Sequence, residues 1–246
     1  MTWLAMPDVS LKRMAIQMLG AFAEAEKVQF ESRLKELLPE LIKLLEPRTE
    51  ETEDREFDLL LIKVNYTLLK IMEHCAVGFK NVENLDITNE LWNRIVQHLK
   101  HPHVWIRTLS ARLVGTLLGW HKVDDLAAYA TNPSEEISPT YLLCPEFAAR
   151  LRSVASVSVD QLQSVMLDNQ LADQVVKNLV FIAKITNRIP ASVQEEDQAS
   201  APPTLAWLTG KLRREINAEV TLRPTIPTKV RNYSQMPISD FISIFY

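Results

Sequence analysis

Glycine is scarce in this chain of 246 residues: only five occur, and none lies in a G-x-G-x-x-G or G-x-x-x-x-G-K pattern. Loops that cradle nucleotide phosphates depend on such glycines, so the sequence argues against a nucleotide-binding α/β enzyme. Cysteine is rarer still. Cys75 and Cys144 stand far apart and form no C-x-x-C pattern, which indicates two buried thiols in a reducing compartment and no nucleophile.

Long hydrophobic runs are also missing. Even the longest apolar runs, such as LLLI at 59–62, are far shorter than the span of about 20 residues that a membrane helix needs. The first residues also lack the pattern of a signal peptide. The formal net charge of −4 gives no overall field that would attract a polyanion, so any nucleic-acid contact must be local. What is present is the composition of a globular protein, with 47% hydrophobic residues and enough length for a substantial core.

Apolar residues recur at helical spacing from the first turn of the chain onward. A first helix is predicted to begin near residue 8, with Asp8 or Ser10 as its N-cap. Its buried stripe is expected to consist of Leu11, Ala15, Leu19 and Phe22.

Four more helices are predicted before residue 120. The helix over 30–47 is expected to kink or split at Pro39 and to end at Pro47. An acidic run at 46–58 reads as a solvated connection before a largely buried helix over 56–75. Thr88 is the expected N-cap of a helix over 88–100. The fifth helix lies in the stretch HPHVWIRTLSARLVGTLLG, residues 101–119.

These helices come in pairs that resemble each other. LKRMAIQMLGAF (11–22) aligns with IRTLSARLVGTL (106–117), because both have an apolar and a basic residue, then a small residue, then an apolar residue and glycine. The two segments lie 95 residues apart with one helix pair between them, so the period is about 45–48 residues, as in HEAT repeats. The predicted fold class is all-α, an α-solenoid of HEAT/armadillo-like helix pairs.

The second half keeps the helical pattern with more interruptions. Residues 121–145 read as short turns of helix joined by loop, SVDQ (158–161) as a capping box, and Asp168 or Asn169 as the next N-cap. The stripe of that helix is predicted to be Leu171, Val175, Leu179 and Ile182. The expected organisation is HEAT-like repeats over 1–190, a flexible linker over 191–203, a further repeat helix over 204–222, and an irregular or disordered tail over 223–246.

Three histidines in the pattern H-x-x-H-x-H invite a metal-site interpretation. A helical zinc pair needs histidines four residues apart on one face, but Pro102 interrupts the chain between His101 and His103. We therefore predict corner residues, with His98 favouring the negative end of its helix dipole. No catalytic, cofactor-binding or metal-binding residue is predicted, and neither an enzymatic activity nor a small-molecule substrate is expected.

Basic residues offer the more promising contacts. They gather near the corner at 100–112 and again after residue 210. Most surface charges of this kind are solvated or ion-paired, but Arg and Lys can also hold RNA phosphates or an acidic partner. The candidate contact residues are Lys100, His103, Arg107, Arg112, Lys211, Arg213 and Arg214. The five tryptophans are expected to be mainly core residues.

Three segments resemble, in the same order, segments of one family of very large HEAT-repeat proteins. They are LKHPHVWIRTLSARLVGTLL (99–118), LADQVVKNLVFIAK (171–184) and LAWLTGKLRREINAE (205–219). The chain is similar over roughly residues 10–219 to the C-terminal part of small-subunit processome component 20, also called the down-regulated-in-metastasis family. Since family members are far longer, the resemblance implies a fragment or a short form.

The resemblance implies a non-enzymatic scaffold in the nucleolus that acts in pre-rRNA processing and small ribosomal subunit biogenesis. Its implied partners are other processome proteins and pre-rRNA. Two other classes stay open from the residues alone. One is a HEAT adaptor outside ribosome assembly, of the transport or phosphatase scaffold type, and the other is an enzyme within a helical fold.

Overall fold

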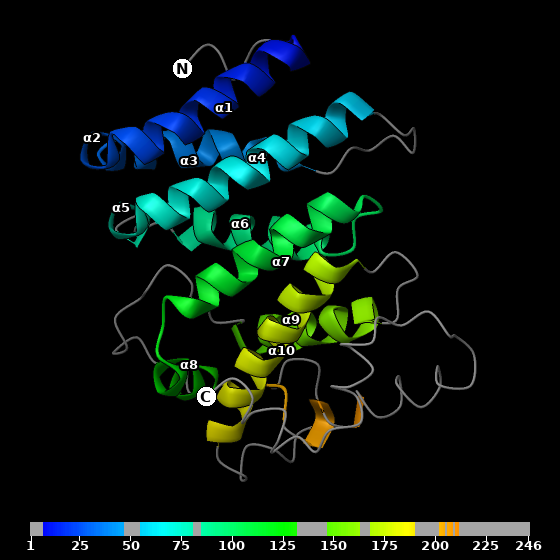
Figure 1. Ribbon diagram of the computed structural model, residues 1–246. Helices are drawn as coiled ribbons and strands as arrows, with labels where there is room; N and C mark the ends of the chain where they lie inside the picture. Colours follow the sequence, from blue (N-terminus) through cyan, green and yellow to red (C-terminus); the bar gives the residue numbers. More distant parts are fainter. Residues whose placement is uncertain are drawn as a thin grey trace. The chain divides into compact units, whose positions relative to one another are not determined.

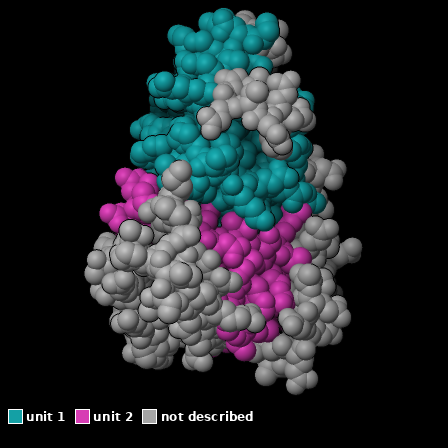
Figure 2. All heavy atoms as spheres, turned by 90° about the vertical axis from the view of Figure 1, so that its right-hand side faces the viewer, with its two compact units in different colours: residues 1–116, 139–142 teal, residues 117–138, 143–246 magenta. Residues whose placement is uncertain are grey.

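The computed structural model describes residues 7–46, 55–80, 85–131, 147–162, 168–189, 202–204, 206–208 and 210–211. These residues form helices and turns and contain no strand, so the predicted all-α class is confirmed. The chain divides into two compact units, one of residues 1–116 with 139–142 and one of residues 117–138 with 143–246 (Figure 2). None of the described helices is long and apolar enough to cross a membrane.

Unit 1 is a stack of helices in two layers (Figure 1). One layer holds α1 (Val9–Ala25), α4 (Arg55–His74) and the first part of α7 (Val104–Gly119), and the other holds α2 (Lys27–Glu31), α3 (Leu34–Lys43), α5 (Ala76–Lys80) and α6 (Leu85–His98). Within the layers α1 packs on α4, α2 on α5 and α3 on α6. Each repeat is thus a long helix, a helical turn and a second helix, which is α-solenoid architecture.

The repeat spacing follows the predicted period. The helices α1, α4 and α7 begin at residues 9, 55 and 104, at intervals of 46 and 49 residues, as in HEAT-type repeats. Asp8 caps α1 as predicted, since its carboxylate accepts hydrogen bonds from the backbone N–H groups of Ser10 at 2.8 Å and Leu11 at 3.1 Å.

The face of α1 that packs on α4 differs from the predicted stripe. Ile16, Gly20 and Ala23 are the buried residues of α1, whereas Leu11 and Phe22 are about half exposed. A Cβ on Gly20 would lie 3.2 Å from Thr67 Oγ1, and that hydroxyl donates to the backbone carbonyl of Ile16 at 3.0 Å. Because Gly20 has no side chain, the backbones of α1 and α4 can approach closely on this side of α1. This close approach favours burial of this side over burial of the predicted stripe.

Three helix boundaries also differ from the sequence prediction. The break between α2 and α3 falls at 32–33, and Pro39 lies inside α3, because deep burial of the surrounding leucines holds that helix together. Helix α6 begins at Leu85, three residues before the predicted cap Thr88. The sequence SVDQ lies inside α9 (Phe147–Leu162), where Ser158 is buried, so packing overrides the capping-box pattern.

Unit 2 is built around α8 (Val123–Thr131), α9 and α10 (Asn169–Arg188), which pack pairwise on one another. The rings of Tyr129 and Phe147 meet edge to face at 5.9 Å between α8 and α9. Asp168 caps α10 as predicted, accepting from Leu171 N–H at 2.7 Å. The predicted stripe of α10 is buried along its whole length, from Leu171 to Ile182.

Candidate functional site

The connection between α6 and α7 is a tight corner within unit 1. After His98, the backbone N–H groups of Leu99, Lys100 and His101 still donate to carbonyls three or four residues back, at 3.0–3.1 Å. Pro102 has no N–H and cannot continue that series, and α7 begins at Val104. The proline therefore ends one repeat helix and starts the next, as the sequence predicts.

His101 and His103 brace this corner by accepting hydrogen bonds from the backbone. His103 N–H donates to His101 Nδ1 at 3.1 Å, and Trp105 N–H donates to His103 Nδ1 at 3.2 Å. An Nδ1 that accepts must be unprotonated, so the proton of a neutral His101 lies on Nε2, which is 3.6 Å from Asp58 Oδ1. The pKa of His101 is lowered, because burial outweighs the attraction of Asp58.

His98 lies deeper and is neutral, which corrects the prediction of a charged residue at the helix end. Its side chain is buried, with Nδ1 3.4 Å from Asn65 Nδ2 on α4. The pKa of His98 is lowered to about 4, first by burial and then by the charge of His101. Burial therefore outweighs the favourable end of the helix dipole.

Arg107 holds the corner together from the first turn of α7. It is 7% exposed, and its Nη1 donates to the carbonyls of His101 at 2.8 Å and Pro102 at 2.7 Å. Hydrogen bonds from a charged donor are about twice as strong as neutral ones. Arg107 is thus a structural brace of the turn, and its guanidinium faces the backbone.

Around this brace the corner presents an aromatic and several basic groups to solvent. Trp105 is 50% exposed and Lys100 is exposed. Arg112, on the third turn of α7, lies 3.7 Å from Glu73 of α4, and both side chains are 46% exposed. An ion pair that long and that solvated constrains neither residue strongly. The exposed tryptophan departs from the expected core role.

A second polar cluster lies in unit 2, where residues 206–208 and 210–211 meet α9. Lys211 Nζ lies 3.1 Å from Asp160 Oδ1 and also donates to Ser156 Oγ. Trp207 lies beside two cations, with Arg152 Cζ 4.7 Å and Lys211 Nζ 5.9 Å from its ring centroid. Such cation–π contacts contribute about 0.5–1 kcal/mol at exposed sites, so this cluster attaches the segment to α9.

The candidate residues therefore fall into separate groups. Lys100, His103, Arg107 and Arg112 belong to the corner of unit 1, and Lys211 belongs to the cluster of unit 2. Arg213 and Arg214 lie outside the described residues, as do Cys144 and most of the predicted linker. Within the described residues no group of three or more His, Cys, Asp or Glu side chains is arranged to hold a metal ion. Cys75 is buried, and burial raises the pKa of its thiol.

Two features of these groups were not predicted from the sequence. Trp105 lies two residues after His103, in the first turn of α7, and is 50% exposed although its neighbours Ile106 and Arg107 are buried. The pairing of Trp207 with Arg152 joins residues 55 positions apart, and no local pattern marks it. The local signal that could have indicated the Trp207–Lys211 contact is the tryptophan followed four residues later by lysine in WLTGK.

Stacked helix pairs joined by tight corners define an all-α repeat protein. The model of the family "Small subunit processome component 20 homolog, C-terminal" matches residues 11–233, so the chain belongs to this family. Among solved structures, the fold is similar to a designed armadillo repeat protein in complex with the peptide (KR)4. That similarity has 13% identity and a TM-score of 0.40, and it covers 98% of this chain and 97% of the designed protein.

Proposed function

We propose that this chain is a non-catalytic scaffold of the small-subunit processome that acts in pre-rRNA processing and small ribosomal subunit biogenesis in the nucleolus. The observation that carries the proposal is the family match, which runs over residues 11–233. A stack of helix pairs suits this role because it offers an extended surface for protein and RNA partners and needs no catalytic pocket.

The partners proposed are other processome proteins and pre-rRNA. The exposed Lys100 and Arg112 of the corner, together with the half-buried His103, form one contact surface. Lys211 is 16% exposed and paired with Asp160, so we assign it to the attachment of its segment to α9 and not to this surface. Arg and Lys side chains hold phosphates without reading sequence, so these contacts position RNA and do not select it. Arg107 contributes indirectly, because it fixes the backbone from which Lys100 and His103 project.

Affinity purification of the tagged chain, followed by identification of the bound proteins and RNA, tests this function. We expect early pre-ribosomal particles with pre-rRNA, and their absence from the purified material would reject the processome assignment. The corner surface is tested separately with Lys100→Glu and Arg112→Glu combined. The matched control is Lys27→Glu with Lys35→Glu, which reverses two exposed charges on α2 and α3 of the same unit.

The two variants separate a general charge effect from a local contact. If the corner contacts RNA, the corner variant loses RNA association and its residual binding depends less steeply on salt, whereas the control keeps the parent's behaviour. Equal losses of RNA association in both variants would show that net charge causes the loss, and would reject the corner as a contact surface.

A further inference from the structure

Helices α4 and α7 each present an aromatic side chain on the solvent side of their layer. Tyr66 on α4 is 45% exposed and Trp105 on α7 is 50% exposed. In Figure 1, α4 lies between α1 and α7 along the stack. Because the repeats of a solenoid are added along the stack, neither an earlier nor a later repeat would cover this side of α4 and α7.

The two rings lie at the same level on their helices. Figure 1 shows α4 and α7 running in the same direction, and Arg112 of α7 lies 3.7 Å from Glu73 of α4. Tyr66 precedes Glu73 by seven residues, and Trp105 precedes Arg112 by seven residues. Seven residues span about two turns, roughly 10.5 Å along the helix. The rings are therefore side by side on neighbouring helices, and such exposed apolar patches mark binding surfaces.

Basic side chains surround this aromatic pair. Lys70 Nζ lies 5.7 Å from the centroid of the Tyr66 ring and is also paired with Glu24 of α1. Lys63, one turn before Tyr66, is half-buried and makes no ion pair with another described residue. Arg112 keeps only its long, solvated contact on the other side. The α4–α7 platform is defined as Lys63, Tyr66, Lys70, Trp105 and Arg112.

Aromatic rings interleaved with cations are the chemistry that binds single-stranded nucleic acid. Bases stack on the rings, while the cations hold the phosphates between them. The bases of a duplex are already stacked on one another, so only an unpaired strand offers free base faces. An apolar peptide laid on the rings would instead bury Lys63 and Arg112 without partners, which is costly. The charges therefore favour RNA over an apolar protein segment.

We propose that the α4–α7 platform binds an unpaired segment of RNA, with bases stacked on Trp105 and Tyr66 and phosphates held by Lys63 and Arg112. The inference rests on the proposed function and deepens it, because it names single-stranded pre-rRNA as the ligand of this side of unit 1. Every base has a face that can stack, so the platform selects for unpaired RNA and not for a sequence.

Fluorescence anisotropy of the full chain with a short labelled oligouridylate tests the platform. Trp105→Leu and Tyr66→Leu should each weaken binding at least about fivefold, which is the lower end of what one base–aromatic stack contributes. Trp105→Phe and Tyr66→Phe keep a ring and should bind like the parent. An RNA duplex of the same length should bind more weakly than oligouridylate. All four variants change exposed side chains, so their thermal midpoints should match that of the parent.

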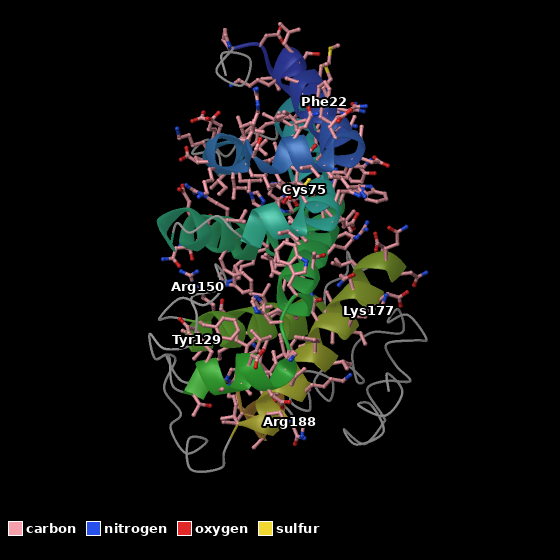
Figure 3. The ribbon with its side chains drawn as sticks, turned by 90° about the vertical axis from the view of Figure 1, so that its left-hand side faces the viewer. Phe22, Cys75, Tyr129, Arg150, Lys177 and Arg188 are labelled. Atoms are coloured by element: carbon pink, nitrogen blue, oxygen red, sulfur yellow. The ribbon has the colours of Figure 1, made fainter. Side chains whose placement is uncertain are left out.

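Phe22→Leu is the matched control, because it removes a ring of the same exposure from another helix of unit 1. Phe22 is 51% exposed on α1 and is labelled in Figure 3. It lies two residues before Glu24, and therefore about 160° around the helix from the side chain that reaches Lys70 of the platform. Phe22→Leu should bind oligouridylate as the parent does.

The dependence of binding on salt separates stacking from charge. Trp105→Leu removes no cation, so affinity should fall with salt as steeply as in the parent, whereas Lys63→Gln combined with Arg112→Gln should make that dependence shallower. Leucine variants that bind like the parent, equal losses in Phe22→Leu, or duplex bound as tightly as oligouridylate would overturn the platform.

These outcomes are independent of the proposed function, which is judged by the processome proteins that accompany the tagged chain. Processome proteins retained with no effect of either leucine variant on oligouridylate binding would reject the platform alone. A selective loss in both leucine variants, with no processome proteins in the purified material, would reject the processome assignment and support the platform.

Discussion

The sharpest structural prediction concerns Arg107, because one buried cation closes the corner between two repeats. Replacing it by methionine keeps most of the side-chain volume but removes both hydrogen bonds to the carbonyls of His101 and Pro102. Hydrogen bonds to a charged group contribute about 1.5–3 kcal/mol. Since both bonds come from one nitrogen, we expect Arg107→Met to lower the free energy of unfolding by about 2–4 kcal/mol.

The matched control is Arg112→Met, the same substitution five residues further along α7. Arg112 makes a 3.7 Å contact with Glu73 across a half-exposed surface, and surface ion pairs contribute about 0–1 kcal/mol. Thermal unfolding of the two variants should therefore differ, with a loss of roughly 5–10 °C for Arg107→Met and little change for Arg112→Met. Equal midpoints for the two variants would refute the role of Arg107 as the brace of the corner.

Three further predictions concern stability. Gly20→Val should destabilise the chain by about 1–3 kcal/mol, because a Cβ at that position meets Thr67 Oγ1 at 3.2 Å, whereas Gly119→Ala, with nothing within 4 Å, should be neutral or stabilising in urea titrations. The pKa of His98 is about 4 in the folded chain and 6.5 without the fold. As the pH falls, the unfolded state therefore binds the extra proton first. About 3 kcal/mol of stability is present above pH 6.5 and is lost as the pH falls to 4. His98→Leu should flatten the unfolding midpoint across that interval, and an unchanged pH profile would contradict this assignment. Asp168→Ala should lower the free energy of unfolding by about 1 kcal/mol in a urea titration, because α10 loses its N-cap. A variant as stable as the parent would show that the cap contributes nothing.

Much of the fold could be predicted from the sequence because its information is local. The caps Asp8 and Asp168, the α10 stripe and the role of Pro102 each depend on neighbours within one or two turns. The repeat period could be predicted as well, since equivalent residues recur at a fixed interval and each repeat packs against the next.

The errors concern choices that local pattern does not determine. The stripe predicted for α1, Leu11, Ala15, Leu19 and Phe22, runs along a different side of the helix from the buried Ile16, Gly20 and Ala23. The close approach of Gly20 to Thr67 of α4 determines which side packs. Pro39 and SVDQ carry local signals for a helix break and a helix start, but burial of the surrounding side chains overrides both.

The candidate site was harder to predict because exposure and charge state are tertiary properties. Lys100 and Arg107 are both basic residues near the same corner, yet one faces solvent and the other binds two backbone carbonyls. His98 and His101 differ in depth, since His98 is buried beside α4 and His101 is half-buried at the corner, and burial lowers the pKa of both.

The most direct test of the proposed scaffold role is affinity purification of the tagged chain with sequencing of the RNA that accompanies it. We expect early pre-ribosomal particles with pre-rRNA. Their yield should fall when Lys100 and Arg112 are both changed to glutamate and should be retained in the Lys27→Glu, Lys35→Glu control. Purified material that lacks pre-rRNA and processome proteins would contradict the scaffold role.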